Sequence, residues 1–205
     1  MSVTSLAILS LYDIYVDASW VPRLEEISDR MRSVAMHGRL VFHRQIENPQ
    51  ILYIVAGWPS LRFNHAHSTE VANEAAEDLL VFAQPLTLIH FNLDFHALPL
   101  DAPVVSIERL FVAKERKKEF DAFFRTVEPL LQEYVAPWTF TSGWRVDLSD
   151  EQQRKGEEEW ILVAGWPTVE KHQDFSKTDM WERYSKIKEM IIRAEEVVHS
   201  TKLAS

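Results

Sequence analysis

The order of hydrophobic and polar positions in the first half of the chain predicts strands and helices in a definite series. Strand-like stretches are apolar and β-branched, whereas helix-like stretches space apolar residues such as Leu24, Ile27 and Met31 three or four positions apart. In chain order the expected elements are strand 3–12, helix 20–36, strand 39–46, strand 51–57, helix 70–82 and strand 86–95. This β-α-β-β-α-β order is the ferredoxin-like arrangement.

The second half predicts the same order of elements. Between its two middle strands, the charged stretch 150–159 is expected to be a loop, with Glu157, Glu158 and Glu159 on the solvated surface. The expected elements are strand 104–112, helix 114–134, strand 139–147, strand 160–165, a helical region 168–190 that restarts near Thr178, and strand 195–202.

A repeated sequence supports this division into halves. Val-Ala-Gly-Trp-Pro occupies 55–59 and again 163–167, at the end of the same expected strand in each half. Self-similarity about half a chain apart indicates an internal duplication. The sequence therefore predicts two ferredoxin-like modules in one chain, residues 1–98 and 99–205.

The strands that lead into the repeat are apolar on both faces. Residues 51–56 and 161–164 do not alternate, as an antiparallel strand with one wet face would. One face is expected to pack on the module's own helices and the other on the second module's sheet. The predicted fold class is therefore α+β, with antiparallel sheets packed as an intramolecular α+β barrel, in a monomer with an internal pseudo-dimer or in a homodimer.

Composition and motifs exclude several classes of function. The net charge of −9 disfavours a nucleic-acid partner, and the chain has no cysteine for disulfides or thiolate chemistry. Five scattered glycines form no phosphate or dinucleotide loop, and Asp94 with His96 is too small a set for a metal site. The apolar run 51–59 is too short for a membrane span, and no signal peptide is recognised. We expect a cytoplasmic protein with no membrane partner, no metal and no cofactor.

The pattern around the repeat resembles a known family. Trp58, Ser60 and His67 in the first half, and Trp166 and Thr168 in the second, are similar to the dimeric α+β-barrel superfamily, in particular to a tandem version of the antibiotic-biosynthesis-monooxygenase-like proteins. This resemblance implies secondary metabolism of polyketide- or terpenoid-like compounds. In the second half Phe175 stands at the place of His67, and His172 stands opposite Asn64.

The candidate site is placed in the first half, which contains six of the eight histidines. His67, at the family spacing from Trp58, is the expected base, because a neutral imidazole accepts protons near neutral pH. His90 is the second expected catalytic residue. The expected substrate-binding residues are Trp58, Asn64, His43, Tyr53 and Asn92.

The sequence therefore predicts an enzyme without a cofactor, of the oxygenase or cyclase/isomerase type, acting on a hydrophobic small molecule in a sheet–helix pocket. One alternative is a non-catalytic protein that binds a small molecule or a partner. Another is haem binding through a first-half histidine.

Overall fold

The computed structural model describes residues 2–13, 20–32, 40–62, 70–195 and 197–204. The chain divides into two compact units, unit 1 comprising Met1–Ala97 and Ser200–Ser205, and unit 2 comprising Leu98–His199. Within the described residues, no helix is both long and apolar enough to cross a membrane.

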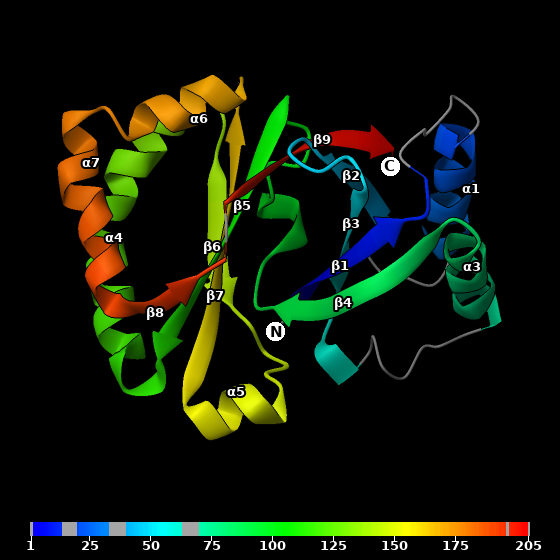
Figure 1. The fold of residues 1–205 in the computed structure, drawn as a ribbon, viewed down its shortest axis with the longest axis horizontal. Coiled ribbons are helices and arrows are strands. Elements are labelled where there is room, and N and C mark those ends of the chain that lie inside the picture. The colour runs from blue at the N-terminus through cyan, green and yellow to red at the C-terminus, as the bar shows by residue number, and fades with distance from the viewer. Residues whose placement is uncertain (1, 14–19, 33–39, 63–69, 196, 205) are drawn as a thin grey trace. The chain divides into compact units, whose positions relative to one another are not determined.

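Unit 1 contains an antiparallel sheet with the strand order β4-β1-β3-β2-β9 (Figure 1). The helices α1 and α3 contact each other beside it. The elements are β1 (Val3–Leu11), α1 (Trp20–Arg32), β2 (Leu40–Gln45), β3 (Ile51–Trp58), α3 (Glu70–Leu80), β4 (Ala83–Phe91) and a 3-10 turn η1 (Phe95–Ala97). Of the last strand, β9 (Val198–Ala204), the part from Ser200 onward belongs to unit 1, and Val198 and His199 belong to unit 2.

Alternation along β1 divides the sheet of unit 1 into two faces. Val3, Leu9 and Leu11 belong to the same buried core as Leu24 and Ile27 of α1. Because side chains alternate along a strand, the odd-numbered residues of β1 face the helices. We call this the helix face of the sheet, and the other side the opposite face.

Unit 2 contains an antiparallel sheet in which β7 lies between β5 and β6, and β8 pairs with the other edge of β5. The helices α4, α6 and α7 lie along one face of this sheet (Figure 1). The elements are β5 (Val104–Ala113), η2 (Lys114–Arg116), α4 (Lys117–Val135), β6 (Phe140–Trp144), α5 (Asp150–Lys155), β7 (Glu157–Trp166), α6 (Val169–Phe175), α7 (Asp179–Tyr184), η3 (Ser185–Met190) and β8 (Ile191–Ala194).

In unit 2 the helix face carries the even-numbered residues of β5. Val104, Leu110 and Val112 share a core with Phe120 and Leu131 of α4. Thr168 begins α6 as expected, because its side chain accepts a hydrogen bond from the backbone N–H of Lys171.

The repeated segment has the same register in both sheets. Trp58 lies opposite Val3, and Trp166 lies opposite Val104. A Cβ on Gly57 would lie 2.6 Å from the Cβ of Phe95. A Cβ on Gly165 would likewise meet neighbouring side chains at 2.9 Å. The two glycines of the repeat therefore allow a close approach of a neighbouring chain segment to the sheet.

The charged stretch 150–159 is not the loop that the sequence predicts. Ser149 and Gln152 form a reciprocal capping box at the start of α5, and Gly156, with φ of 66°, ends that helix. β7 then begins at Glu157, so that Glu159 lies within the sheet and is fully buried. The prediction of a solvated Glu159 was wrong.

Two further strand boundaries differ from expectation. The last expected strand, 195–202, corresponds to β9, which starts at Val198, and a strand that was not expected, β8, ends before it at Ala194. β4 begins at Ala83 and includes Pro85, and it ends at Phe91. Asn92 therefore lies just beyond the strand in which it was expected.

Candidate functional site

Two central residues of the expected site, His67 and Asn64, lie outside the described residues. The remaining five are in or beside β2, β3 and β4 of unit 1. His43, Tyr53, Trp58 and His90 are buried, and Asn92 is partly exposed.

The sheet separates these residues into two groups. Trp58 lies in the helix-face core, and His90 pairs with Ser5, which is on the same face. His43 and Tyr53 are opposite each other on β2 and β3, one position from the helix-face residues Phe42 and Ile54. Because neighbouring residues on a strand point to opposite sides, His43 and Tyr53 are on the opposite face. They do not share a side of the sheet with Trp58 and His90.

The opposite-face pair has local partners. The hydroxyl of Tyr53 donates to Oε1 of Gln45 at 3.2 Å, and Nδ1 of His43 lies 3.2 Å from Oγ of Ser200. Both side chains are therefore held by neighbouring strands of unit 1.

On the helix face of unit 1, Trp58 is fixed by a hydrogen bond. Its indole Nε1–H donates to Oγ of Ser5 at 2.8 Å, and Ser5 is the residue opposite His90. His90 is only 1% exposed. Trp58, Ser5 and His90 thus form a compact polar group under the helix layer.

Unit 2 contains the same tryptophan–serine bond and extends it. The indole Nε1–H of Trp166 donates to Oγ of Ser106 at 2.8 Å. The imidazole of His172 stacks on Trp166, with ring centroids 4.3 Å apart and planes 13° apart. Nδ1 of His172 then lies 2.8 Å from Nε2 of His199. Four side chains from β5, β7, α6 and β9 therefore form one connected series.

His90 and His199 are at corresponding places in the sequences of the two units. Pro85 lies opposite Leu9, and Ala194 lies opposite Leu110. Each histidine follows its reference residue by five positions. In unit 1 the residue that corresponds to His172 is Asn64. Asn64 lies outside the described residues.

A carboxyl group lies two positions from Ser106 on the same face of β5. Glu108 is opposite Leu162, which belongs to the helix-face core, and the residue is half-buried. Its counterpart in unit 1 is Ala7, which lies opposite Ile54. A carboxyl group at this position therefore distinguishes unit 2 from unit 1.

Burial raises the pKa of Glu108 to about 7, and the positive charge of Lys188 only partly counteracts this effect. The pKa of Tyr184, a buried residue at the end of α7, is raised well above 10 by burial and by the nearby Glu108 charge. At neutral pH Glu108 can therefore exchange a proton, while Tyr184 keeps its phenolic hydrogen and remains a donor.

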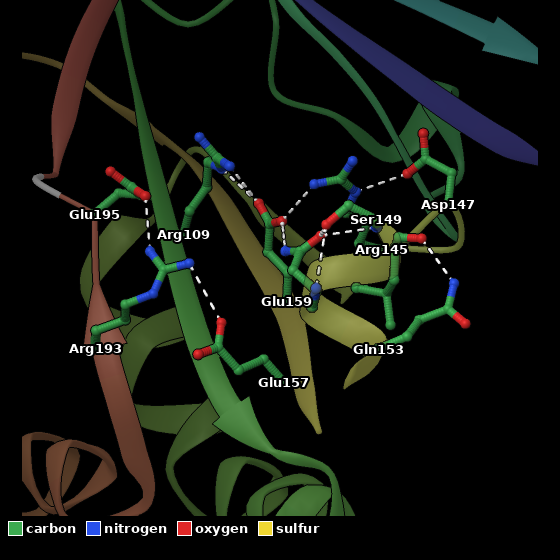
Figure 2. Close-up of polar contacts among 11 residues, drawn as sticks. Arg109, Arg145, Asp147, Ser149, Gln153, Glu157, Glu159, Arg193 and Glu195 are labelled. Atoms are coloured by element: carbon green, nitrogen blue, oxygen red, sulfur yellow. Dashed lines mark hydrogen bonds and ion pairs between the residues drawn. The ribbon is translucent and has the colours of Figure 1, made fainter. Parts of the chain in front are cut away.

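A second polar cluster lies on the opposite face of the unit 2 sheet (Figure 2). Glu159 accepts hydrogen bonds from Arg109 at 2.6 Å, from Arg145 at 2.9 Å and from Gln152 at 3.0 Å. Arg145 also donates to Asp147 at 2.8 Å. Burial pushes the pKa of Glu159 up, but the charge of Arg109 and the hydrogen bonds outweigh it, so that this pKa lies below its usual value. A fully paired carboxylate of this kind holds structure and is a poor proton acceptor.

The chain matches no known family model and no curated protein sequence. Its structure is similar to a candidate monooxygenase from Lactobacillus acidophilus, with a TM-score of 0.67, 14% identity, and coverage of 98% of this chain and 93% of that chain. An anthrone oxidase-like protein gives a TM-score of 0.60 at 9% identity, covering 100% and 92% of the two chains. A DypB variant of Rhodococcus jostii in complex with haem gives 0.66 at 8% identity, covering 98% and 93%.

The chain shares its fold with these solved proteins. This similarity supports the resemblance that the sequence indicates at the level of the α+β fold.

Because one of these structural neighbours is a complex with haem, the described histidines can be compared with an axial ligand, which needs a ring nitrogen open to iron. His43 and His90 are each 1% exposed, and His172 lies flat on Trp166. These three rings do not fit that role. The haem alternative therefore depends on His96, which is exposed, or on first-half histidines outside the described residues. Among the described residues, no three acidic or histidine side chains gather to hold a metal ion.

Sequence reasoning missed these unit 2 residues for identifiable reasons. His172 and His199 are 27 positions apart, and their contact depends on the fold. The signals available were a glutamate within the apolar strand 104–112, and Val-Val-His at 197–199 matching Leu-Ile-His at 88–90.

Proposed function

We propose that this chain is a cofactor-independent enzyme of the monooxygenase type, in which Glu108 moves a proton to or from a hydrophobic small molecule on the helix face of unit 2. The single observation that carries this proposal is a half-buried glutamate on the helix face of the unit 2 sheet, at the position where the other unit has Ala7. The fold shared with candidate monooxygenases and with an anthrone oxidase-like protein supports the reaction class.

The chemistry required of such a residue is general base catalysis. A carboxylate whose pKa is about 7 is half ionised at neutral pH and can take a proton from an acidic C–H or phenol. Tyr184 supplies a hydrogen-bond donor near the same carboxyl group, suited to an oxygen atom on which negative charge develops. An electron-rich substrate anion formed in this way can react with O₂ itself. Without O₂, the same proton transfers would serve a cyclase or isomerase.

The first half remains a separate proposal for the site. There His67 would accept the proton, His90 and Asn64 would orient the substrate, and Trp58 would form a wall beside it. His43, Tyr53 and Asn92 complete the proposed binding residues, although His43 and Tyr53 are on the opposite face of the sheet. Replacing His67 with alanine would lower turnover roughly a hundredfold if this histidine is the base.

The experiment compares variants from both halves in one assay. We would use 1,8-dihydroxyanthrone, a carbon acid with phenolic groups, and measure oxygen uptake and quinone absorbance. Glu108→Gln is expected to lower kcat roughly a hundredfold and to remove the pH dependence near neutrality. Glu115→Gln, at an exposed site in η2, is the matched control.

The outcomes separate the proposals. Loss of turnover in Glu108→Gln but not in His67→Ala supports the unit 2 site, and the reverse supports the first half. Wild-type turnover and an unchanged pH profile in Glu108→Gln would remove this residue from the mechanism. Saturable binding of the anthrone without oxygen uptake would favour the non-catalytic alternative, and a Soret band on addition of haem would favour the haem alternative.

A further inference from the structure

A lysine on the helix side of unit 2 lies over a tryptophan ring without forming an ion pair. Nζ of Lys188, in η3, is 4.9 Å from the centroid of the Trp181 ring. Lys188 is exposed, and within the part of the chain that the structure describes its ammonium group pairs with no carboxylate. Its positive charge can therefore be used by a ligand that arrives from solvent.

The backbone that carries Lys188 is anchored beside the strand of Glu108. Ile187, the residue before Lys188, is buried in the helix-face core of unit 2. The chain continues directly from η3 into β8, where Ile191 lies opposite Val112 of β5. Lys188 is close enough to Glu108 for its charge to lower the pKa of that carboxyl group against the effect of burial. The lysine and the glutamate are thus on the same side of the unit 2 sheet.

Two further aromatic rings hold Trp181 in place. The ring of Tyr184 is stacked on it, with centroids 5.8 Å apart and planes 26° apart, and Phe175 meets it edge-on at 5.7 Å. Phe175 and Tyr184 are buried, whereas Trp181 is half-buried. Aromatic rings therefore lead from the exposed Lys188 to Tyr184, whose pKa responds to the charge of Glu108. Such rings suit the flat face of an aromatic ligand.

We infer that Lys188 binds the negatively charged oxygen of the substrate anion, and that the site selects planar aromatic compounds whose deprotonation gives a phenolate or an enolate. This inference rests on the proposed function, because it names the residue that stabilises the anion formed when Glu108 removes a proton. Lys188 is then a second catalytic residue of unit 2.

Proton removal moves a negative charge and creates none. The C–H or O–H bond of the substrate breaks, its electron pair stays on the substrate, and a new O–H bond forms at the carboxylate of Glu108. The negative charge passes from Glu108 to the substrate oxygen. Because the substrate oxygen contacts Lys188 directly and the carboxylate of Glu108 does not, the ammonium group stabilises the anion more strongly than the starting state.

The first test measures binding and needs no turnover. Near pH 6, Glu108 with its pKa of about 7 is mostly neutral, so an anionic ligand reproduces the charges that follow proton removal. By titration calorimetry, the wild type is expected to bind naphthalene-2-carboxylate roughly tenfold more tightly than the uncharged naphthalene-2-carboxamide. Lys188→Met is expected to lose this preference, because it keeps the length of the side chain and removes its charge.

Two control variants accompany this binding test. Lys188→Arg should keep the preference for the carboxylate, and Lys186→Met, at an exposed lysine of the same 3-10 turn, should leave it unchanged. Equal affinity of the wild type for the two ligands, or a preference that survives in Lys188→Met, would overturn the inference.

The second test measures turnover of 1,8-dihydroxyanthrone as a function of pH. Lys188→Met is expected to lower kcat roughly tenfold. It should also move the midpoint of the pH profile upward, because loss of the positive charge raises the pKa of Glu108 further. A residue that only supported the fold of η3 would not move this midpoint. Lys188→Arg should restore both quantities and Lys186→Met should change neither, whereas an unchanged kcat and midpoint in Lys188→Met would count against the role of Lys188.

Failure of this inference and failure of the proposed function give different results. If Glu108→Gln abolishes turnover while Lys188→Met keeps the wild-type kcat and pH midpoint, only the role of Lys188 is wrong. If Glu108→Gln turns over at the wild-type rate, the proposed function fails, and the comparison of the two naphthalene ligands still decides whether Lys188 binds an anion.

Discussion

Glu108 and Glu159 lie on neighbouring strands of unit 2, on opposite faces of the sheet, and their carboxyl groups respond to burial in opposite ways. Glu108 has apolar surroundings and Lys188 as a weakly compensating charge, so burial prevails and its pKa rises. Glu159 is surrounded by the donors of Arg109, Arg145 and Gln152, and its pKa falls. A carboxyl group whose pKa is raised by burial is available for proton transfer near neutral pH, whereas a carboxylate that is fully paired is not.

This contrast predicts a pH dependence of stability that Glu108 causes. Its pKa is about 7 in the folded chain and 4.5 ordinarily, so between these values the folded state binds the proton more strongly than the unfolded state. Stability from this group is therefore greatest at low pH and falls as pH rises to about 7, by at most about 3 kcal/mol. Glu108→Gln should become more stable than the wild type as pH rises through this window.

Urea unfolding of both proteins across that pH range measures the difference, and Glu115→Gln corrects for general charge effects. A stability difference between Glu108→Gln and the wild type that does not change with pH would show that Glu108 titrates at its ordinary value.

For Glu159 we expect the opposite pH dependence of stability. Its folded pKa is lowered, so its contribution is present above the ordinary value of 4.5 and is lost as pH falls through the folded value. At neutral pH, Glu159→Gln leaves Arg109 and Arg145 without their shared charge and is expected to cost about 3–5 kcal/mol in unfolding free energy. Glu157→Gln, on the same strand face, loses only a 3.5 Å contact to the exposed Arg193 and should cost under about 1 kcal/mol (Figure 2). Equal losses in the two variants would contradict a structural role for the buried cluster.

At the scale of elements, sequence periodicity predicted most helices and strands because their apolar positions repeat locally. It failed at the start of β7, where three successive glutamates hide the strand pattern. Glu159 is stabilised there by Arg109 and Arg145, which are 50 and 14 positions away. The same limit applies to the site, since the His172–His199 bond joins an exposed helix to a later strand. Local patterns carry no information on such partners.

The repeat offers an element-scale prediction at Gly165. A Cβ added there would lie 2.9 Å from the Cβ atoms of both Ala102 and Pro99 and 3.1 Å from that of Trp138. These atoms are attached directly to the backbone and cannot rotate away, so Gly165→Ala is expected to cost about 1–3 kcal/mol. Adding Ala102→Gly should recover part of that loss in thermal or urea unfolding. Full stability of Gly165→Ala alone would show that the segment at 99–102 yields freely.

At the scale of the whole molecule, the last strand of the chain pairs with a strand from the first half of the sequence. Ser200–Ser205 groups with unit 1, because β9 pairs with β2 while the residues before it belong to unit 2. The sequence predicted a boundary that assigns 99–205 to one module, and no local pattern reveals that the final residues pair with a strand more than 150 positions earlier. A long-range pairing of this kind depends on the topology of the complete chain.

Removal of Ser200–Ser205 is therefore expected to destabilise unit 1, although the deleted residues come last in the chain. β2 would lose its pairing with β9, the Ser200 contact to His43 and the buried Ala204, at a cost of roughly 2–4 kcal/mol. Hydrogen exchange read by mass spectrometry should show lost protection in β2 and β3, with β5 and β7 retained. Ser200→Ala, which removes only the contact to His43, should cost about 1 kcal/mol. Protection of β2 that survives the deletion would mean that β9 adds nothing to this sheet. Loss of protection in β5 and β7 as well would mean that the two units unfold together.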